Sequence, residues 1–159
     1  MNAKIKELWE KKKQEGLIIY SSRGSGKTTT MLEIAIEESK KHKVAIWCMH
    51  EAHKNFIESE LKYKHKILHP NKIKVFSYKN TNDHAEALKL EPDYNFYDEI
   101  KIYEKQPKSL IIRSFLPDDN IYIFNVKSNS LLSEERLNEL KSQLTSEQWE
   151  AEFMSNVIS

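Results

Sequence analysis

The sequence is short of cysteine, arginine and glycine, and each shortage narrows the possible chemistry. Its 159 residues include one cysteine, Cys48, which excludes a disulfide framework within the chain and a metal site built from several thiolates. This usage fits a reduced, cytoplasmic compartment. Only three arginines stand among the 25 basic residues, so Arg23, Arg113 and Arg136 can each be considered individually. Two of the three glycines stand close together, which marks one short segment where the backbone turns sharply.

The sequence also lacks a long apolar run and an excess of charge of either sign. No stretch approaches the roughly 18 apolar residues of a membrane helix, and residues 1–20 are lysine-rich without the apolar centre of a signal peptide. The formal net charge is +1, with 24 acidic residues against 25 basic ones, so no overall field draws the chain to a membrane or to nucleic acid. We expect a soluble protein with a single domain over residues 1–159.

Short apolar runs alternate with amphipathic segments along the chain. The mainly apolar runs, which are strand candidates, are 17–20, 44–49, 73–76, 94–97 and 121–124. The segments with helical spacing are 3–15, 27–41, 53–61, 84–88 and 133–157. Residues 110–112 fit either a helix or a strand. This alternation predicts an α/β fold, with a mostly parallel central sheet flanked by helices.

A phosphate-binding loop is indicated at residues 21–28, directly after the first apolar run and before a helix. The Walker A pattern asks for glycine, four residues and then Gly-Lys-Ser/Thr; Gly26, Lys27 and Thr28 match it, and Ser21 stands at the first glycine position. In such a loop the backbone amides and the helix N-terminus hold phosphate oxygens, the lysine reaches the β- and γ-phosphates, and the hydroxyl completes a magnesium shell. ATP and Mg²⁺ are therefore the expected ligands. The residues expected to surround them are Ser22, Arg23, Gly24, Ser25, Gly26, Lys27, Thr28 and Thr29.

An acidic pair, Asp98 and Glu99, follows the apolar run 94–97. In a parallel sheet the strand ends meet at the edge where active sites lie. There, Asp98 and Thr28 can hold magnesium, and Glu99 can polarise the attacking water. The arrangement favours ATP hydrolysis over phosphate transfer to a small acceptor, with Lys27 and Glu99 as catalytic residues. Glu51, after the second apolar run, is the alternative base.

The segment 22–29 resembles the deviant Walker A of large terminase subunits, the ATPases that pump DNA into tailed-phage and herpesvirus capsids. That family often lacks the first glycine and carries an arginine within the loop, as Ser21 and Arg23 do here. Residues 96–99 are similar to its Walker B and catalytic glutamate, and residues 144–153 are similar to the segment that closes its ATPase domain. The resemblance implies a P-loop NTPase of the ASCE, RecA-like type.

The resemblance also implies roles for further residues. Arg23 would be an arginine finger acting on the γ-phosphoryl group within its own subunit. Asn125 and Ser128 stand where the family has its coupling motif, and residues 133–159 would be the helical segment before the family's linker. Arg113 and Arg136 are candidates for a finger offered to a neighbouring subunit, with a surface salt bridge as the alternative for both.

The activity implied by this resemblance is ATP hydrolysis that powers translocation of double-stranded DNA into a procapsid, in the host cytoplasm. The partners would be DNA, the portal or procapsid, and further copies in a ring on the capsid, with a monomer of low activity when isolated. The family's second half is a nuclease, and the chain ends where that half would begin, so no nuclease activity is expected. The sequence leaves open whether the chain is an excised domain or a protein that never had a nuclease.

Two other functions remain open from the sequence. One is a helicase-type or other DNA-linked ATPase, although helicases need a second RecA-like lobe. The other is a nucleotide-binding assembly module that hydrolyses ATP slowly or not at all.

Two groups of side chains could serve other ligands. The lysine clusters at 11–13, 40–43 and 62–66 could contact a DNA backbone, or could be solvated helix faces balanced by acidic residues. The histidines at 50, 53, 65 and 69 lack the partnering cysteine or carboxylate set of a zinc site. We therefore expect magnesium alone.

Overall fold

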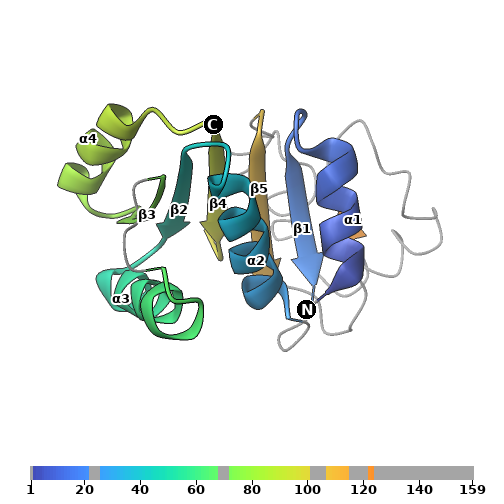
Figure 1. The fold of residues 1–159 in the computed structure, drawn as a ribbon, viewed down its shortest axis with the longest axis horizontal. Helices are drawn as coiled ribbons and strands as arrows, with labels where there is room; N and C mark the ends of the chain where they lie inside the picture. The colour runs from blue at the N-terminus through green and yellow to red at the C-terminus, as the bar shows by residue number, and fades with distance from the viewer. Residues whose placement is uncertain (1, 22–25, 68–71, 101–106, 115–121, 124–159) are drawn as a thin grey trace, which may run out of the picture.

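The computed structural model describes residues 2–21, 26–67, 72–100, 107–114 and 122–123, which form an α/β fold around one sheet (Figure 1). The sheet has the strand order β3-β2-β4-β5-β1-β6. The strands are β1 (Leu17–Ser21), β2 (Val44–Cys48), β3 (Ile73–Ser77), β4 (Tyr94–Asp98), β5 (Ser109–Ser114) and β6 (Tyr122–Ile123). The first five are parallel, and β6 pairs antiparallel with β1. The prediction of a mostly parallel sheet is confirmed.

The helices of the described residues are α1 (Ala3–Lys12), α2 (Lys27–Ser39), α3 (Glu51–Ser59) and α4 (Thr81–Leu90), and α3 continues into a π-helical turn, η1 (Glu60–Lys64). Each predicted helix up to residue 90 is therefore present, with shifted ends. The undecided segment 110–112 lies in β5. The predicted helical segment 133–159 lies outside the described residues, and the assignment of 1–159 to one domain stays a prediction. Among the described residues no helix is both long and apolar enough to cross a membrane.

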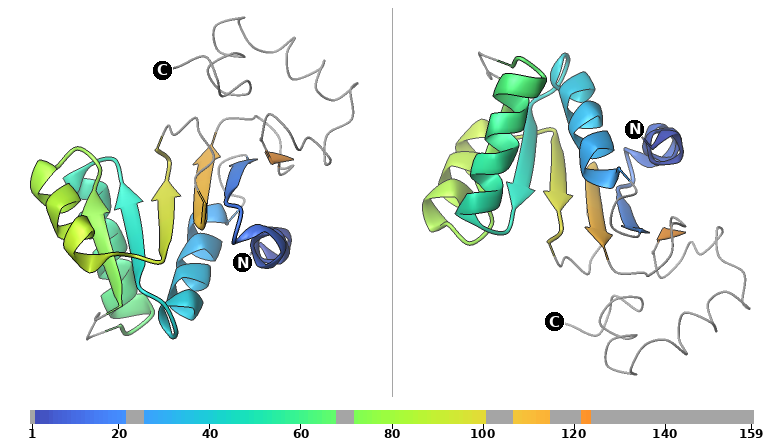
Figure 2. Two further views of the ribbon diagram at one scale, coloured as in Figure 1. Left: turned by 90° about the horizontal axis from the view of Figure 1, so that it is seen from above. Right: turned by 90° about the horizontal axis from the view of Figure 1, so that it is seen from below.

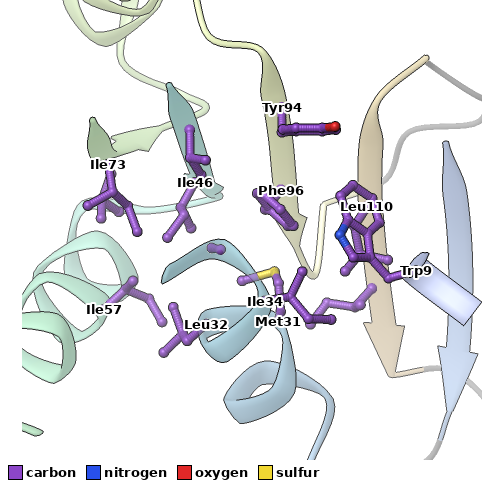
Figure 3. Close-up of a cluster of buried hydrophobic side chains, with 14 of the residues drawn as sticks. Trp9, Met31, Leu32, Ile34, Ile46, Ile57, Ile73, Tyr94, Phe96 and Leu110 are labelled. Atoms are coloured by element: carbon purple, nitrogen blue, oxygen red, sulfur yellow. The ribbon is translucent and has the colours of Figure 1, made fainter. Parts of the chain in front are cut away.

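One face of the sheet carries the larger core and is covered by α1, α2 and α3 (Figures 2 and 3). Ile5 and Trp9 are one helical turn apart on α1 and are fully buried. The Trp9 ring packs 5.2 Å from that of Phe96 between centroids, and its indole Nε1 donates to Glu38 Oε1 at 3.3 Å. These contacts attach α1 to α2 and to the middle of the sheet.

The opposite face carries a second cluster, to which α4 contributes. Ala87 of α4 is buried there with Trp47, Phe76 and Tyr97 from three neighbouring strands. The Trp47 and Tyr97 rings are nearly parallel, with 10° between their planes, and Trp47 Nε1 donates to Asn95 Oδ1 at 3.0 Å. Since both faces of the sheet are packed, the central strands β1 and β2 are nearly continuous apolar runs rather than alternating ones.

The strand register brings the polar ends of three strands to one edge of the sheet. Ser21 of β1 is level with Ser114 of β5, and Asp98 of β4 is level with Ile112 of β5 and with Cys48 of β2. Strand β5 thus lies between the strand that leads into the phosphate-loop segment and the strand that ends in Asp98. Residues far apart in the sequence meet at this edge.

Candidate active site

At the start of α2 the structure describes Gly26, the residue before Lys27 in the predicted phosphate-binding loop. Gly26 caps the helix in the left-handed region, with φ +78°, and its carbonyl accepts hydrogen bonds from the Thr30 backbone at 2.9 Å and hydroxyl at 2.7 Å. A side chain at Gly26 would meet no atom of the described residues within 4 Å. The left-handed backbone angle by itself favours glycine at this position. The loop residues Ser22, Arg23, Gly24 and Ser25 lie outside the described residues.

Lys27 is the first residue of α2, and its side chain points into the site rather than into solvent. It is 5 % exposed, and its Nζ lies 3.6 Å from Glu99 Oε1. The two predicted catalytic side chains therefore meet, although 72 positions of sequence separate them. Lys27 and Thr28 begin the same helical turn, so both lie at the carboxyl edge of the sheet. Thr29, the last residue predicted to surround the nucleotide, is half-buried in that turn.

Asp98 ends β4 as a buried carboxylate beside Thr28. Its side chain is 1 % exposed, and the Thr28 hydroxyl lies 3.2 Å from Oδ1 and 3.5 Å from Oδ2. Carboxylate and hydroxyl oxygens suit Mg²⁺, which is usually held by one or two carboxylates together with waters and substrate phosphates. No group of three or more His, Cys, Asp or Glu side chains among the described residues could hold a metal without such help. The donor set therefore fits magnesium in the predicted place.

Glu99 is held in an unusual backbone conformation by residues of β5. Its φ is +60°, a left-handed conformation that costs roughly 1–2 kcal/mol for a residue with a side chain. Its backbone N–H donates to Ile112 O at 2.9 Å, and its carboxylate accepts from the Ser114 backbone N–H at 2.8 Å and the Ser114 hydroxyl at 2.7 Å. Strain of this kind collects at functional sites. In this conformation Glu99 Oε1 lies 3.6 Å from Lys27 Nζ.

Ser114 is a site residue that the sequence analysis missed. Ser114 belongs to the site because residues 109–114 form a strand between β4 and β1, and this placement depends on distant residues. Its position two residues after the apolar run 110–112, at a strand end, was the available signal.

His53 is a second missed residue, because the histidines were considered only as zinc ligands. It lies in the first turn of α3, which begins just after β2, and its Nε2 is 2.9 Å from Asp98 Oδ2. The hydrogen bond to Asp98 raises the pKa of His53 above its ordinary value; burial opposes this shift, and the charges of Asp98 and Glu99 add to it. The signal in the sequence was a histidine near the start of the helix that follows the second apolar run, 44–49.

Of the three arginines, only Arg113 lies among the described residues. Arg113 is 7 % exposed, and its guanidinium carbon lies 5.7 Å from the centre of the Tyr20 ring. It packs against Tyr20 of β1 and is buried rather than projecting into solvent, and its role as a finger for a neighbouring subunit stays a prediction. Arg23 and Arg136 lie outside the described residues, as do the coupling candidates Asn125 and Ser128.

Several lysines of the predicted clusters are paired with neighbouring acidic side chains. Lys11 lies 3.1 Å from Glu7, and Lys40 lies 2.9 Å from Glu37. These pairs are exposed, as expected for solvated helix faces. A DNA-contacting role for any cluster stays a prediction.

Cys48 ends β2 directly beside Asp98 in the sheet and is fully buried. Burial raises the pKa of its thiol to about 12, with further contributions from the charges of Asp98 and Glu58, against which Lys54 acts. The side chain is therefore a neutral packing group at the base of the site.

A scan against models of known protein families found no match, and neither did searches of curated proteins and of solved structures.

Proposed function

We propose that this protein is a Mg²⁺-dependent ATPase of the P-loop class, with a RecA-like ASCE fold. The proposal rests on two contacts between residues about seventy positions apart. At the start of α2, Thr28 lies beside Asp98, the last residue of β4, and Lys27 lies beside Glu99, which follows Asp98. A lone Walker-like pattern occurs by chance. Its convergence with a buried carboxylate and a second, strained one at a single sheet edge supports nucleotide hydrolysis. The sheet of five parallel strands is compatible with this fold.

Each of these side chains has a distinct part in the proposed reaction. Lys27 binds the β- and γ-phosphate oxygens, and Thr28 and Asp98 hold the metal. Magnesium, when bound, neutralises charge that develops on the phosphates. Glu99 orients the attacking water and accepts its proton, and Ser114 holds the Glu99 carboxylate in place through two hydrogen bonds. Arg23 would stabilise the transition state from within the loop.

The work driven by hydrolysis is proposed to be translocation of double-stranded DNA into a procapsid. Support comes from the terminase-like features of the sequence: Ser21 in place of glycine, Arg23 within the loop, and the Asp98–Glu99 pair. In this proposal several copies act as a ring on the portal, and the isolated chain is a monomer with low turnover.

Nucleotide binding provides the first test, because it does not require assembly. We expect the purified chain to bind a fluorescent ATP analogue in the presence of Mg²⁺. Lys27→Ala should weaken binding about 10- to 150-fold, because a hydrogen bond to a charged group contributes roughly 1.5–3 kcal/mol. Lys89→Ala is the matched control, since Lys89 is an exposed lysine of α4 paired with Glu86 at 3.3 Å. Equal binding by the two variants would contradict the P-loop assignment.

DNA dependence tests the second part of the proposal. Double-stranded DNA with portal-bearing procapsids should raise ATP turnover, and the active species should contain several copies of the chain by sedimentation. Stimulation by single strands alone, with one copy per strand, would instead support a helicase-type enzyme. Binding with no turnover under any of these conditions would support the assembly module.

A further inference from the structure

His53 connects α3 to the carboxylate that is proposed to hold the metal. Its ring nitrogen lies 2.9 Å from Asp98 Oδ2, while the Thr28 hydroxyl lies nearer to the other oxygen, Oδ1, at 3.2 Å. The two partners come from different helices, α3 and α2, on the same face of the sheet. The carboxylate is therefore held from two sides.

The burial of the two groups indicates which of them depends on the other. Asp98 is 1 % exposed, so water can contribute little to fixing its orientation, whereas His53 is 28 % exposed and can be solvated alone. A buried carboxylate with a missing partner bears a desolvation cost and is free to rotate about its terminal bond. Removing the histidine should thus alter the orientation of Asp98 more than it alters α3.

A separate metal site at His53 is not indicated. Its close partner is the one carboxylate of Asp98, and no third His, Cys, Asp or Glu in the described part of the chain joins them. The contact instead resembles the outer hydrogen bonds that orient carboxylates which themselves bind a metal.

We propose that His53 is a positioning residue for magnesium binding, which it promotes by holding Asp98 Oδ2 so that Oδ1 faces Thr28. The inference rests on the proposed function, because it assigns the metal to Thr28 and Asp98. The new element of the inference is that the affinity for Mg²⁺ depends on α3, which lies outside both the phosphate-loop segment 21–28 and the pair Asp98–Glu99.

The test compares nucleotide binding with and without metal. A fluorescent ADP analogue is titrated in EDTA, and then at a series of Mg²⁺ concentrations, for the wild type, His53→Ala, His53→Gln and His53→Asn. Loss of an outer-shell partner typically costs 10- to 100-fold in metal affinity. We therefore expect the Mg²⁺ concentration for half-maximal effect to rise at least about 10-fold in His53→Ala, with metal-free binding unchanged within about two-fold.

Glutamine and asparagine separate hydrogen bonding from shape. The glutamine amide can reach the place of Nε2 and donate to Asp98, and should restore the Mg²⁺ dependence to within about three-fold of wild type. Asparagine is too short and should behave like alanine, so the comparison holds even where His53→Ala does not fold. His50→Ala is the matched control, because His50 caps α3 without a side-chain hydrogen bond to the helix. Its Mg²⁺ dependence should equal that of the wild type.

The outcomes distinguish the two proposals. A Mg²⁺ dependence unchanged in His53→Ala or His53→Asn would overturn the positioning role, and so would an equal loss of binding with and without metal. Failure of the wild type itself to bind nucleotide with Mg²⁺ would overturn the proposed function, and this inference with it.

Discussion

Replacing Glu99 by glutamine separates binding from hydrolysis, because the change removes charge and almost nothing else. The carboxylate now accepts two hydrogen bonds from Ser114. A glutamine can keep both contacts: its carbonyl oxygen accepts from the Ser114 backbone, and its amide group donates to the Ser114 hydroxyl. The left-handed backbone at position 99 is unaffected by this substitution. We therefore expect Glu99→Gln to fold as the wild type does.

The expected effect on binding follows from the contact between Lys27 and Glu99. Their charged atoms are 3.6 Å apart and the Glu99 side chain is 35 % exposed, so solvent screens the pair and its contribution is about 0.5–1 kcal/mol. A phosphate that takes over Lys27 must break this pair. The glutamine variant lacks the competitor and should bind ATP about two- to five-fold more tightly than the wild type. Its rate of hydrolysis should fall about 10²- to 10⁴-fold, the usual contribution of a general base.

The measurement is a titration with a fluorescent ATP analogue in Mg²⁺, followed by hydrolysis under single-turnover conditions. Glu51→Gln is the control, because Glu51 also lies at the carboxyl edge but pairs with Asn80 at 2.9 Å. Weaker binding by Glu99→Gln would refute the competition for Lys27. Hydrolysis that survives in Glu99→Gln and is lost in Glu51→Gln would make Glu51 the base.

Substitutions at two further positions, Arg23 and Trp9, test the loop and the core. Arg23→Ala should keep ATP affinity and lose about 10³- to 10⁵-fold in kcat, because a finger acts only in the transition state, and Arg23→Lys should restore little. Mixing Arg23→Ala with Lys27→Ala chains should give no recovery in turnover assays; recovery would assign the arginine to a neighbouring subunit. Trp9→Ala should lower the free energy of unfolding by about 3–5 kcal/mol in urea titrations, since Trp9 is fully buried against Phe96, while Trp9→Phe should lose less. A loss below about 1 kcal/mol for Trp9→Ala would contradict the packing of α1 on the sheet.

The parts of this fold that the sequence predicts are those set by local patterns. Continuous apolar runs identified β1 and β2, and runs with one polar residue each, Lys74 and Asn95, identified β3 and β4. A strand buried on both faces can be recognised from its own residues, without knowledge of its partner strands. Residues 110–112 stayed undecided, because a short apolar run fits both periodicities. Their identity as a strand depends on pairing with β1 and β4, which is information from distant residues.

The residues of the candidate site also fall into those predicted from local motifs and those that depend on distant residues. Lys27, Thr28, Asp98 and Glu99 stand in motifs whose spacing predicts a phosphate and metal site. His53 and Ser114 contact those residues, and both contacts depend on which strands are neighbours and on where α3 packs. Arg113 shows the same dependence: once Ile112 and Ser114 are placed in a strand, the residue between them must face the other side of the sheet.

The buried position of Cys48 determines how a fluorescent dye can be attached to this protein at one chosen site. Maleimide reagents react with thiolates, and burial, which raises the pKa of the Cys48 thiol to about 12, favours its unreactive protonated form near neutral pH. A cysteine introduced at Tyr63, which is 72 % exposed on η1, would therefore take up a fluorophore while the native thiol stays unmodified. The chain can carry a single dye at the end of α3 without prior removal of its own cysteine.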